Sequence, residues 1–395
     1  MLLGLAGRHE YNSRISSRIA VRPHAACRRG EGARVGSGAS VAELGEFGLI
    51  ARLAGTLAWP ASPGLAPGLK VGIGDDAAVW APTPNTWNVI TTDALIENVH
   101  FRLRTTSWYD LGWKSLAVNL SDVAAMGARP RYAVVSLGVP GDVAVAAVEE
   151  FGRGLADVGA RYGTALVGGD TVAAPCATIS VTVVGETPPA APGAPPPLLQ
   201  RSTGRVGDAV AVTGQLGASA GGLRLLEDAA RAALRDTPRA APAGPDLPAA
   251  EALRGAHLRP TPRVDAAAVL LAQGVRCAMD LSDGLLGDAR RLADASAVGV
   301  VLEAPRVPVA PALARLFPDD ALALALGGGE DYELLCAGPD AVLAEAAAAL
   351  AARGEPPLTV VGRLVAPPAA GPRVRVVDAR GAPLPISGGY VHFRG

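Results

Sequence analysis

The spacing of apolar residues alternates between a helical and a strand period from residue 41 onward. Apolar positions recur at helical spacing in three segments, which are expected to form helices at residues 41–55, 111–126 and 143–162. Short runs rich in Val and Ile predict strands at residues 87–92, 132–139, 165–167 and 179–185. Because strands and helices alternate, this half of the chain is expected to be an α/β domain.

A proline-rich break at residues 187–197 (TPPAAPGAPPP) ends this pattern, because such a stretch fits neither a helix nor a central strand. It marks a turn at the sheet edge or a linker. A second stretch rich in Pro and Ala, residues 236–248, is expected to be a loop. Otherwise the alternation resumes, with strands expected at 209–213, 275–279, 298–303 and 358–364 and helices at 220–234, 264–273, 285–295 and 341–352. The second half is therefore also α/β, and we place the two domains at residues 45–198 and 199–395.

The N-terminal stretch to about residue 44 has no sustained apolar period and is predicted to be a disordered, Arg-rich extension. Residues 1–40 carry seven arginines and two acidic residues. Such a start can mimic an organelle transit peptide, although its apolar stretch is too short for a secretory signal. A start codon assigned too far upstream accounts for the extension more simply than targeting does.

The length and the balanced charge of the chain limit the classes of function. At about 100 to 200 residues per domain, 395 residues make two domains. Lys+Arg 36 against Asp+Glu 37 gives a formal net charge of -1, which supplies no long-range field for gripping nucleic acid or an anionic membrane. Because no uninterrupted apolar run reaches the roughly 18 residues that span a bilayer, we expect a soluble protein with neither nucleic-acid nor membrane partners.

Cysteine and lysine usage narrows the possible sites further. The four cysteines lie far apart, without a CxxC pair: Cys27, Cys176, Cys277 and Cys336. A zinc site or a redox dithiol is therefore not expected, and the cytoplasm is the simplest location. Neither of the two lysines, Lys70 and Lys114, follows a GxxxxG motif, which excludes Walker-type phosphate binding.

Acidic residues recur where apolar runs meet Gly, Ser or Thr, and five such clusters stand out. They are GIGDDA at 72–77, TTD at 91–93 with His100 after it, NLSDVAAMG at 119–127, VGGDT at 167–171 and MDLSDG at 279–284. Acids just beyond strand ends lie on the crevice side of an α/β sheet, where ligands bind. We therefore expect these clusters to meet in one crevice.

Several carboxylates gathered in one crevice repel each other unless a cation compensates their charge. Oxygen ligands favour Mg²⁺, which commonly bridges carboxylates to substrate phosphates. The clusters thus indicate a metal-nucleotide site and phosphoryl transfer, with Arg201 and Lys114 helping to neutralise the triphosphate. For any single cluster a helix cap is the simpler interpretation, and this applies to Ser121, Asp122, Ser282 and Asp283. Five clusters with one layout favour the metal site.

Three further features carry weaker signals. Residues 214–222 (GQLGASAGG) lie between a predicted strand and helix, where backbone N–H groups could hold a phosphate. Close packing of the helix on the strand accounts for these glycines equally well. His100 could contact a phosphate or the substrate, or pack half-buried. Tyr390 could stack on a ring or anchor the C-terminal tail in the core.

Taken in order, these motifs resemble the thiamine-monophosphate kinase family, in the superfamily that includes aminoimidazole-ribonucleotide synthetase. The resemblance runs from GEFGLIARL at residue 45 to GGYVHF at the C-terminus. It also includes WKSLAVNLSDVAAMGA, RSTGRVGD, HLRPTPR and GGGEDYELL. The pair NLSDxAAMG and GGEDYELL distinguishes this family from its relatives.

The resemblance implies a two-domain PurM-like α/β fold, with an N-terminal α/β domain whose sheet dimerises. It implies ATP-dependent phosphorylation of thiamine monophosphate to thiamine diphosphate. By matching positions it implies Mg²⁺ ligands at Asp76, Thr91, Thr92, Asp93, Asp122, Asp170, Asp280 and Asp283, Asp75 being the weaker member of its pair. It implies ATP contacts at Gly169, Asp170, Arg201 and Ser282, and contacts to thiamine monophosphate at His100, Glu330 and Tyr390.

The sequence departs from the family pattern in the N-terminal extension, in the two longer Pro-rich stretches and at Tyr390, where either Trp or Tyr is expected. Other activities of the superfamily fit less well. A selenophosphate synthetase would need a reactive Cys or selenocysteine with Lys in a glycine-rich N-terminal loop, and a hydrogenase-maturation carbamoyl dehydratase a C-terminal Cys. The chain ends in HFRG and has neither. A non-catalytic regulator that binds Mg²⁺ and nucleotide is a further alternative, which the complete acidic clusters disfavour.

Overall fold

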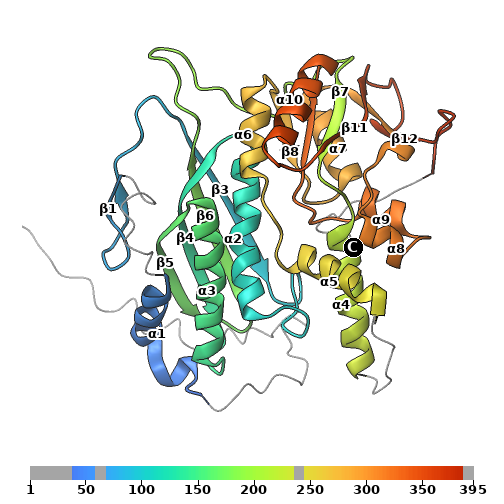
Figure 1. Cartoon of the computed structure of the whole chain (residues 1–395). Coiled ribbons are helices and arrows are strands. Elements are labelled where there is room, and N and C mark those ends of the chain that lie inside the picture. Colours follow the sequence, from blue (N-terminus) through green and yellow to red (C-terminus); the bar gives the residue numbers. More distant parts are fainter. Residues whose placement is uncertain (1–37, 58–67, 235–243, 386–395) are drawn as a thin grey trace, which may run out of the picture.

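Two β-sheets of different size organise the chain, one in each half of the sequence. The computed structural model describes residues 38–57, 68–234 and 244–385. Figure 1 shows the N-terminal sheet with its helices beside the C-terminal sheet with its own. The predicted α/β class and the two-domain organisation are confirmed.

The N-terminal sheet has the strand order β3-β6-β4-β5. Its strands are β3 (Asn88–Ile96), β4 (Arg129–Val139), β5 (Ala165–Ala173) and β6 (Thr178–Glu186). β6 pairs antiparallel with β3 and β4, whereas β4 and β5 are parallel. Because side chains alternate between the faces of a sheet, Val135, Ile179 and Val181 point to one face and form the core of the domain there.

Two helices, α2 (Trp108–Ala125) and α3 (Val145–Tyr162), cover that face, and α1 (Val41–Leu57) packs beside α3 (Figure 1). The approach of α2 to α3 depends on glycine. A Cβ atom on Gly112 would lie 2.0 Å from the carbonyl oxygen of Phe151, and one on Gly154 would lie 2.0 Å from that of Tyr109. Neither position therefore accepts a side chain without moving the helices apart.

The opposite face of the N-terminal sheet carries exposed apolar side chains. Ile90 is 71% exposed, Val172 52% and Val134 39%. A short hairpin of β1 (Leu69–Val71) and β2 (Val79–Trp80) lies near one end of the sheet, where the Trp80 and Tyr132 rings are 4.9 Å apart. Exposed apolar residues grouped on one sheet face are typical of a surface that meets another protein.

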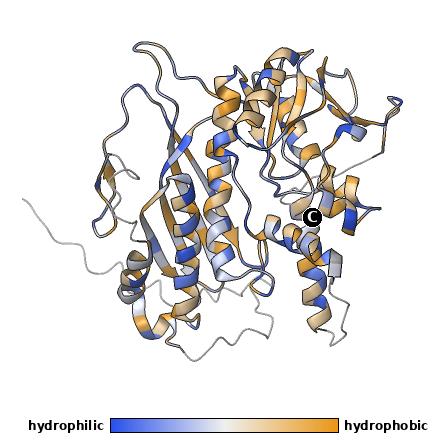
Figure 2. Ribbon diagram, in the orientation of Figure 1, coloured by the Kyte–Doolittle hydropathy of each residue, from blue (hydrophilic) through white to orange (hydrophobic). Residues whose placement is uncertain are grey.

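The C-terminal sheet has the strand order β12-β9-β11-β7-β10-β8, antiparallel except for the parallel β12–β9 pair. Its strands are β7 (Ala209–Thr213), β8 (Cys277–Asp280), β9 (Gly299–Glu303), β10 (Leu334–Gly338), β11 (Leu358–Val365) and β12 (Val374–Val377). Both faces are buried, so its strands are apolar on both sides, as the orange colour of much of this sheet shows in Figure 2.

Helices cover the two faces of this sheet with separate cores. α6 (Val264–Ala272) and α10 (Asp340–Ala352) pack on one face, and α7 (Leu285–Ser296) and α9 (Ala321–Gly327) on the other. α4 (Ala218–Leu234), α5 (Leu247–Leu258) and α8 (Pro311–Leu316) form a separate cluster. The last turn of α2 joins the domains, because Ala124 and Ala125 belong to the same core as α6 and β8.

The connection between the sheets matches its prediction, and several short elements do not. Residues 187–208 are described throughout and form neither helix nor strand, so the predicted boundary at 198/199 falls inside a linker. The predicted loop 236–248 is wrong at its end, because α5 begins at Leu247 with Pro in its first turn. β1, β2, β10, β12, α5, α8 and α9 were not predicted, since they are too short or too uniformly apolar to show a period.

The predicted N-terminal extension is also too long at its inner end. α1 begins at Val41, with a break at Gly45 (φ 74°), so its residues 41–44 are helical rather than disordered. Residues 1–37 of that extension lie outside the described part of the chain. Of the helices that the structure describes, none has both the length and the apolar character needed to cross a membrane.

Candidate active site

A cavity of about 1330 Å³ lies where the two domains meet. β3 and α2 of the N-terminal domain line it on one side, and β8, α4, α5 and the loop before β10 line it on the other. Four aspartates of the predicted clusters line it: Asp93, Asp122, Asp280 and Asp283. The expectation that acids from both halves share one crevice is therefore confirmed for these four.

Their positions along the chain differ from the expected strand ends. Asp122 lies in the helix α2, and Asp93 lies within β3, while Asp280 is the last residue of β8. Asp93 reaches the cavity because it points to the helix-covered face of the sheet, as Thr91 does. The prediction that each acid follows the end of a strand is thus wrong for Asp93 and Asp122. Asp93 reaches the cavity through the alternation of side chains along β3, and Asp122 through its position in α2.

Asp122 is held by a hydrogen bond from the preceding strand. The Thr91 hydroxyl donates to Oδ2 of Asp122 at 2.6 Å. Burial raises the pKa of Asp122, and this hydrogen bond together with the charge of Arg201 opposes the rise. Thr91 therefore fixes the orientation of the carboxylate, and the Arg201 guanidinium lies close enough to stabilise its negative charge.

Asp280 is the most deeply buried of the three carboxylates that interact through their charges. The Ser121 hydroxyl donates to its Oδ2 at 2.8 Å, and both side chains are buried. Burial and the charges of Asp122 and Asp93 raise the pKa of Asp280 to about 7. Burial and the charge of Asp122 likewise raise the pKa of Asp93 to about 6. Because the charge of Asp122 raises the pKa of both neighbouring carboxylates, the group favours an added positive charge.

Asp283 already has a cationic partner. Arg291 bridges Asp283 and the buried Asp288, and the backbone N–H of Asp283 donates to Asp288 Oδ2 at 3.0 Å. Ser282, beside it, lines the cavity. The loop that carries these residues is thus fixed by charge, and Asp283 would have to share its carboxylate with Arg291 when a metal binds.

The GGGEDYELL segment packs directly against this loop. The backbone N–H of Glu330 donates to the Ser282 carbonyl at 2.8 Å, and that of Tyr332 donates to the Leu281 carbonyl at 2.9 Å. Glu330 (φ 67°) and Tyr332 (φ 52°) both adopt a left-handed backbone, which costs a non-glycine residue roughly 1–2 kcal/mol. Strained residues of this kind often occur at functional sites, and both line the cavity.

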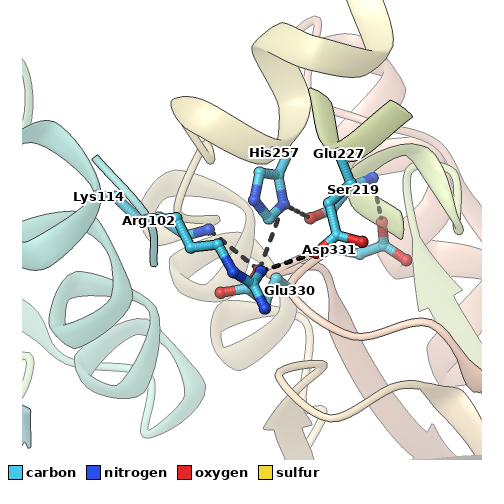
Figure 3. A network of polar contacts seen from close by, with 7 residues as sticks. All are labelled: Arg102, Lys114, Ser219, Glu227, His257, Glu330 and Asp331. Atoms are coloured by element: carbon cyan, nitrogen blue, oxygen red, sulfur yellow. Dashed lines mark hydrogen bonds and ion pairs between the residues drawn. The ribbon is translucent and has the colours of Figure 1, made fainter. Parts of the chain in front are cut away.

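Figure 3 shows a network of polar contacts around Glu330. Lys114 Nζ donates to Glu330 Oε2 at 3.0 Å, and His257 Nδ1 lies 3.3 Å from the same oxygen. His257 Nδ1 is also 3.0 Å from the Ser219 hydroxyl. Lys114 was expected to help neutralise a triphosphate, and this was wrong, because its side chain is only 3% exposed and is paired with Glu330.

His100 lies on the cavity wall and is half-buried, and its contact with a phosphate or the substrate stays a prediction. The backbone N–H of Ile96 donates to its Nδ1 at 3.1 Å. An acceptor Nδ1 in a neutral ring leaves the proton on Nε2, which makes His100 a donor through Nε2.

Several other residues that the family resemblance implies, and that the structure describes, do not line this cavity. Asp76 and Asp75 are exposed on the segment between β1 and β2, where Asp75 Oδ1 accepts from the backbone N–H of Asp76. Thr92 points to the opposite sheet face from Thr91, because it exchanges hydrogen bonds with Thr182 and the Val181 carbonyl.

Gly169 and Asp170 lie in β5, at the far edge of the same sheet. Asp170 is exposed and shares a cross-strand row with Ser136 and Ser180 on the open face. Gly169 contacts β4 so closely that a Cβ atom would lie 2.1 Å from the Val135 carbonyl oxygen. Tyr390 lies outside the described residues, and its predicted role stays a prediction.

The glycine-rich turn 214–222 is a packing feature. Asp331 Oδ2 accepts from the backbone N–H of Gly217 at 2.6 Å and Oδ1 from that of Ser219 at 3.2 Å, so an internal carboxylate occupies the start of α4. A Cβ atom on Gly222 would lie 2.0 Å from the Leu253 carbonyl oxygen. These contacts support close packing over phosphate binding.

Comparison with known proteins connects this geometry to a family. Residues 74–187 match the N-terminal domain model of AIR synthase related proteins, and residues 205–375 match the C-terminal one. The thiamine-monophosphate kinase of Synechococcus elongatus is 33% identical over 363 residues, which cover 90% of this chain and 98% of that protein. The thiamine-monophosphate kinase of Escherichia coli (strain K12) is 36% identical over 75% of this chain and 85% of its own length.

The chain belongs to the thiamine-monophosphate kinase family. Solved structures agree with this assignment. The thiamine-monophosphate kinase from Stenotrophomonas maltophilia superposes with a TM-score of 0.69 at 37% identity, covering 85% of this chain and 96% of that one. The structure of AaThiL complexed with AMPPCP and TMP superposes with a TM-score of 0.64 at 32% identity, covering 89% and 98%. The hydrogenase maturation protein HypE, at 19% identity and a TM-score of 0.60, shares the fold.

Sequence reasoning missed several residues at the site of this member of the thiamine-monophosphate kinase family. His257 and Tyr332 line the cavity and are buried, and Ser121 orients Asp280. His257 stands in the HLRPTPR motif and Tyr332 in GGGEDYELL, so motif membership was the available signal. Their roles depend on contacts between segments more than 70 residues apart, which spacing along the chain does not reveal.

Metal binding can be assessed from the donors alone. Among the residues with described positions, no three His, Cys, Asp or Glu side chains surround one point as a complete protein site would require. The donors that face the cavity are carboxylate oxygens, which fit Mg²⁺. Mg²⁺ is commonly held by one or two carboxylates, with substrate phosphates and water completing its shell. The arrangement therefore fits a metal that arrives with a phosphorylated ligand.

Proposed function

We propose that this protein transfers the γ-phosphoryl group of ATP directly to the phosphate of thiamine monophosphate, producing thiamine diphosphate and ADP. The observation that carries the proposal is the cavity between the domains, which Asp93, Asp122 and Asp280 line so closely that the charge of Asp122 raises the pKa of the other two. Membership of the thiamine-monophosphate kinase family supports the choice of acceptor.

The acceptor explains why the site lacks an obvious general base. A phosphate monoester oxygen is already ionised at neutral pH, so no side chain has to remove a proton before it attacks. The difficulty is to bring two anions together in line, which requires positioning and neutralisation of charge. Carboxylates that gather cations, rather than a His-Asp pair, are what this reaction needs from the protein.

Mg²⁺ would supply the neutralising charge when bound. We propose that Asp93, Asp122 and Asp280 hold several Mg²⁺ ions together with substrate phosphates, one or two carboxylates to each ion, and that Thr91 acts by orienting Asp122. Asp283 would contribute by sharing its carboxylate with Arg291. Asp76, Thr92 and Asp170 remain proposed ligands that this cavity does not include.

The proposed substrate contacts fall into two groups. Ser282, on the cavity wall, and Arg201, whose charge acts on Asp122, would contact ATP. Gly169 and Asp170 retain proposed ATP roles on the basis of the family pattern alone. His100 and Glu330 face the cavity from opposite domains and would contact thiamine monophosphate.

We further propose a homodimer formed through the open face of the N-terminal sheet. Ile90, Val134 and Val172 give this face an apolar surface that a second copy would bury. Thr92 and Asp170 lie on the same face, so their proposed ligand roles depend on the dimer. Sedimentation analysis of Ile90→Asp against wild type tests this, and an unchanged dimer in the variant would contradict it.

A reducing, cytoplasmic location is proposed from the cysteines. Cys176, Cys277 and Cys336 are buried and form no disulfide within the described part of the chain. Burial raises the pKa of Cys336 to about 12, so this thiol remains protonated and unreactive.

The acceptor assignment is tested by an acceptor panel. Purified protein is mixed with ATP, Mg²⁺ and one of several acceptors: thiamine, thiamine monophosphate, a nucleoside monophosphate or a sugar phosphate. Chromatography then separates the products. We expect thiamine diphosphate from thiamine monophosphate and no product from unphosphorylated thiamine. ADP formation that requires another acceptor in place of thiamine monophosphate would refute the assignment.

A further inference from the structure

Lys114 forms a buried ion pair that spans the domain junction at the cavity. It comes from α2 of the N-terminal domain, and its Nζ donates to Oε2 of Glu330, which precedes β10 of the C-terminal domain. Its side chain is almost fully buried, whereas that of Glu330 is partly exposed and lines the cavity. The contact therefore joins a site residue to the opposite domain.

The use of lysine at this position is unusual for the chain. Only two of its 36 basic residues are lysines, and Lys114 is one of them. A lysine ammonium is a compact point charge, whereas an arginine guanidinium is a wide planar fork. The compact ammonium suits this position, because the side chain is buried and meets a single carboxylate oxygen.

His257 contacts the same oxygen from a third element. Its Nδ1 lies 3.3 Å from Glu330 Oε2 and 3.0 Å from the Ser219 hydroxyl, as Figure 3 shows. Burial and the charge of Lys114 lower the pKa of His257 to about 4, so the ring is neutral near pH 7. The hydrogen bond of Nδ1 is with the Ser219 hydroxyl, and the neutral ring lies against Glu330 Oε2, so Lys114 alone supplies positive charge to the pair.

Both contacts engage Oε2, and the backbone is fixed as well. The left-handed Glu330 donates its N–H to Ser282, and the next residue, Asp331, binds the start of α4. The Glu330 side chain thus has one oxygen held from two directions while its residue lines the cavity. No hydrogen bond within the described part of the chain engages Oε1, so this oxygen is the one left for a ligand.

We propose that Lys114 and His257 are positioning residues that hold Glu330 so that its carboxylate receives the cationic, N–H-bearing ring system of the acceptor. This inference rests on the proposed function, because thiamine monophosphate carries a thiazolium cation and an aminopyrimidine. A carboxylate held in one orientation loses less conformational entropy on binding and selects a ligand of that charge. Neither positioning residue contacts the transferred phosphoryl group.

Burial alone raises the pKa of Glu330, but the charge and hydrogen bond of Lys114, together with contributions from His257 and His100, outweigh it, and the pKa lies below its usual value. The ligand thus meets a carboxylate rather than a carboxylic acid. Without the ammonium, the same buried group would favour its neutral form.

Steady-state kinetics of Lys114→Met, with thiamine monophosphate and ATP varied separately, test the proposal. Met keeps the length of the side chain and removes the charge. We expect KM for thiamine monophosphate to rise about tenfold or more, while KM for ATP changes less than about twofold. His257→Gln, which retains a donor, should raise KM for thiamine monophosphate less than His257→Leu.

A double-mutant cycle distinguishes positioning from general damage. In Glu330→Gln, the group being positioned has lost its charge, so adding Lys114→Met should raise KM for thiamine monophosphate little further. Additive effects of the two substitutions would overturn the proposal, even if Lys114→Met folds poorly, because circular dichroism and thermal melting report folding separately. The matched control is Arg129→Met, which removes another ion pair between the domains, with Asp265, and should leave both KM values unchanged.

The outcomes separate this inference from the function on which it rests. If wild type makes no thiamine diphosphate, both are refuted. If wild type is active and Lys114→Met shows unchanged KM for thiamine monophosphate, or an equal rise in both KM values, only the positioning role is refuted.

Discussion

The Ser121 hydroxyl of α2 donates to Asp280 Oδ2 at the end of β8, at 2.8 Å and with both side chains buried. This hydrogen bond joins the two domains behind the cavity. It also orients one carboxylate of the proposed metal site from the neighbouring domain, one residue before Asp122. Domain packing and site geometry therefore depend on the same turn of one helix.

Ser121→Ala should lower the free energy of unfolding by about 1–3 kcal/mol, because it leaves a buried carboxylate oxygen without its donor. Urea unfolding of the metal-free protein measures this. The control is Ser115→Ala, which removes a hydroxyl bonded to the Gly112 carbonyl of its own helix and should cost less than about 1 kcal/mol. Equal losses in the two variants would contradict a special role for the Ser121–Asp280 bond.

Asp122→Asn should reduce kcat by a factor of about 100 or more, because it removes a charge that the proposed transfer uses to hold Mg²⁺. Stability should stay the same or increase, since Asp122 and Asp280 repel each other. Enzyme assays and thermal melting report the two effects. Asp265→Asn, an exposed carboxylate paired with Arg129, should change neither. Near-normal turnover of folded Asp122→Asn would remove Asp122 from the metal site.

The metal-free protein should lose stability as the pH rises from about 4 to 7. Burial and neighbouring charges raise the pKa of Asp280 to about 7 and that of Asp93 to about 6, above the ordinary value of about 3.9. In this range the folded state binds more protons than the unfolded state. The stabilising contribution of Asp93 and Asp280 is therefore present below pH 4 and disappears as each carboxyl ionises. His257, whose pKa is lowered from 6.5 to about 4, acts in the opposite sense between those values, whereas Asp288 and Asp331, whose pKa values are raised to about 6 and about 7, add to the loss. Glu330 and Glu186, whose pKa values are lowered, act in the opposite sense at lower pH.

Thermal melts in EDTA between pH 5 and 8, for wild type and Asp280→Asn, check this dependence. Between pH 5 and 8, the free energy of unfolding of the variant should change by at least about 1 kcal/mol less than that of wild type, because residue 280 can no longer ionise. Mg²⁺ with ATP should recover stability at pH 8 in wild type, by mass action on the folded state. A wild-type profile that rises from pH 5 to 8 as steeply as that of Asp280→Asn would contradict the account.

Gly154→Ala should destabilise the N-terminal domain by about 2 kcal/mol or more, because its Cβ would meet the Tyr109 carbonyl oxygen at 2.0 Å. Chemical unfolding measures the loss. Gly255→Ala in α5 is the matched control: nothing lies within 4 Å of its Cβ position, so the helix should gain about 0.5–1 kcal/mol. Opposite signs are the expected result, and two variants of similar stability would show that α2 and α3 can separate freely.

The sequence predicts the long elements of this fold well, because α2, α3 and β6 each show a clear period. Short strands such as β10 give no period, since both of its faces are buried and its residues are uniformly apolar. The order of the strands within each sheet could not be predicted from the sequence either. β10 inserts between β7 and β8, although other elements separate it from both along the chain.

The site could be predicted in part from the positions of acids, and the reason for that success differs from the one expected. Asp93, Asp122 and Asp280 meet, yet they come from a strand interior, a helix and a strand end. Periodicity shows that adjacent Thr91 and Thr92 point to opposite faces of β3, but it does not show which of them faces α2. The pairing of Lys114 with Glu330 depends on domain packing, which no local pattern records.

The most direct test of the central claim follows the transferred group itself. Wild type is given ATP labelled in the γ-phosphoryl group, Mg²⁺ and thiamine monophosphate, and the label is then measured in thiamine diphosphate, in inorganic phosphate and in residual ATP. The account predicts one labelled thiamine diphosphate for each ADP formed, with almost no labelled inorganic phosphate. Label that appears in inorganic phosphate while thiamine monophosphate stays unchanged would contradict it.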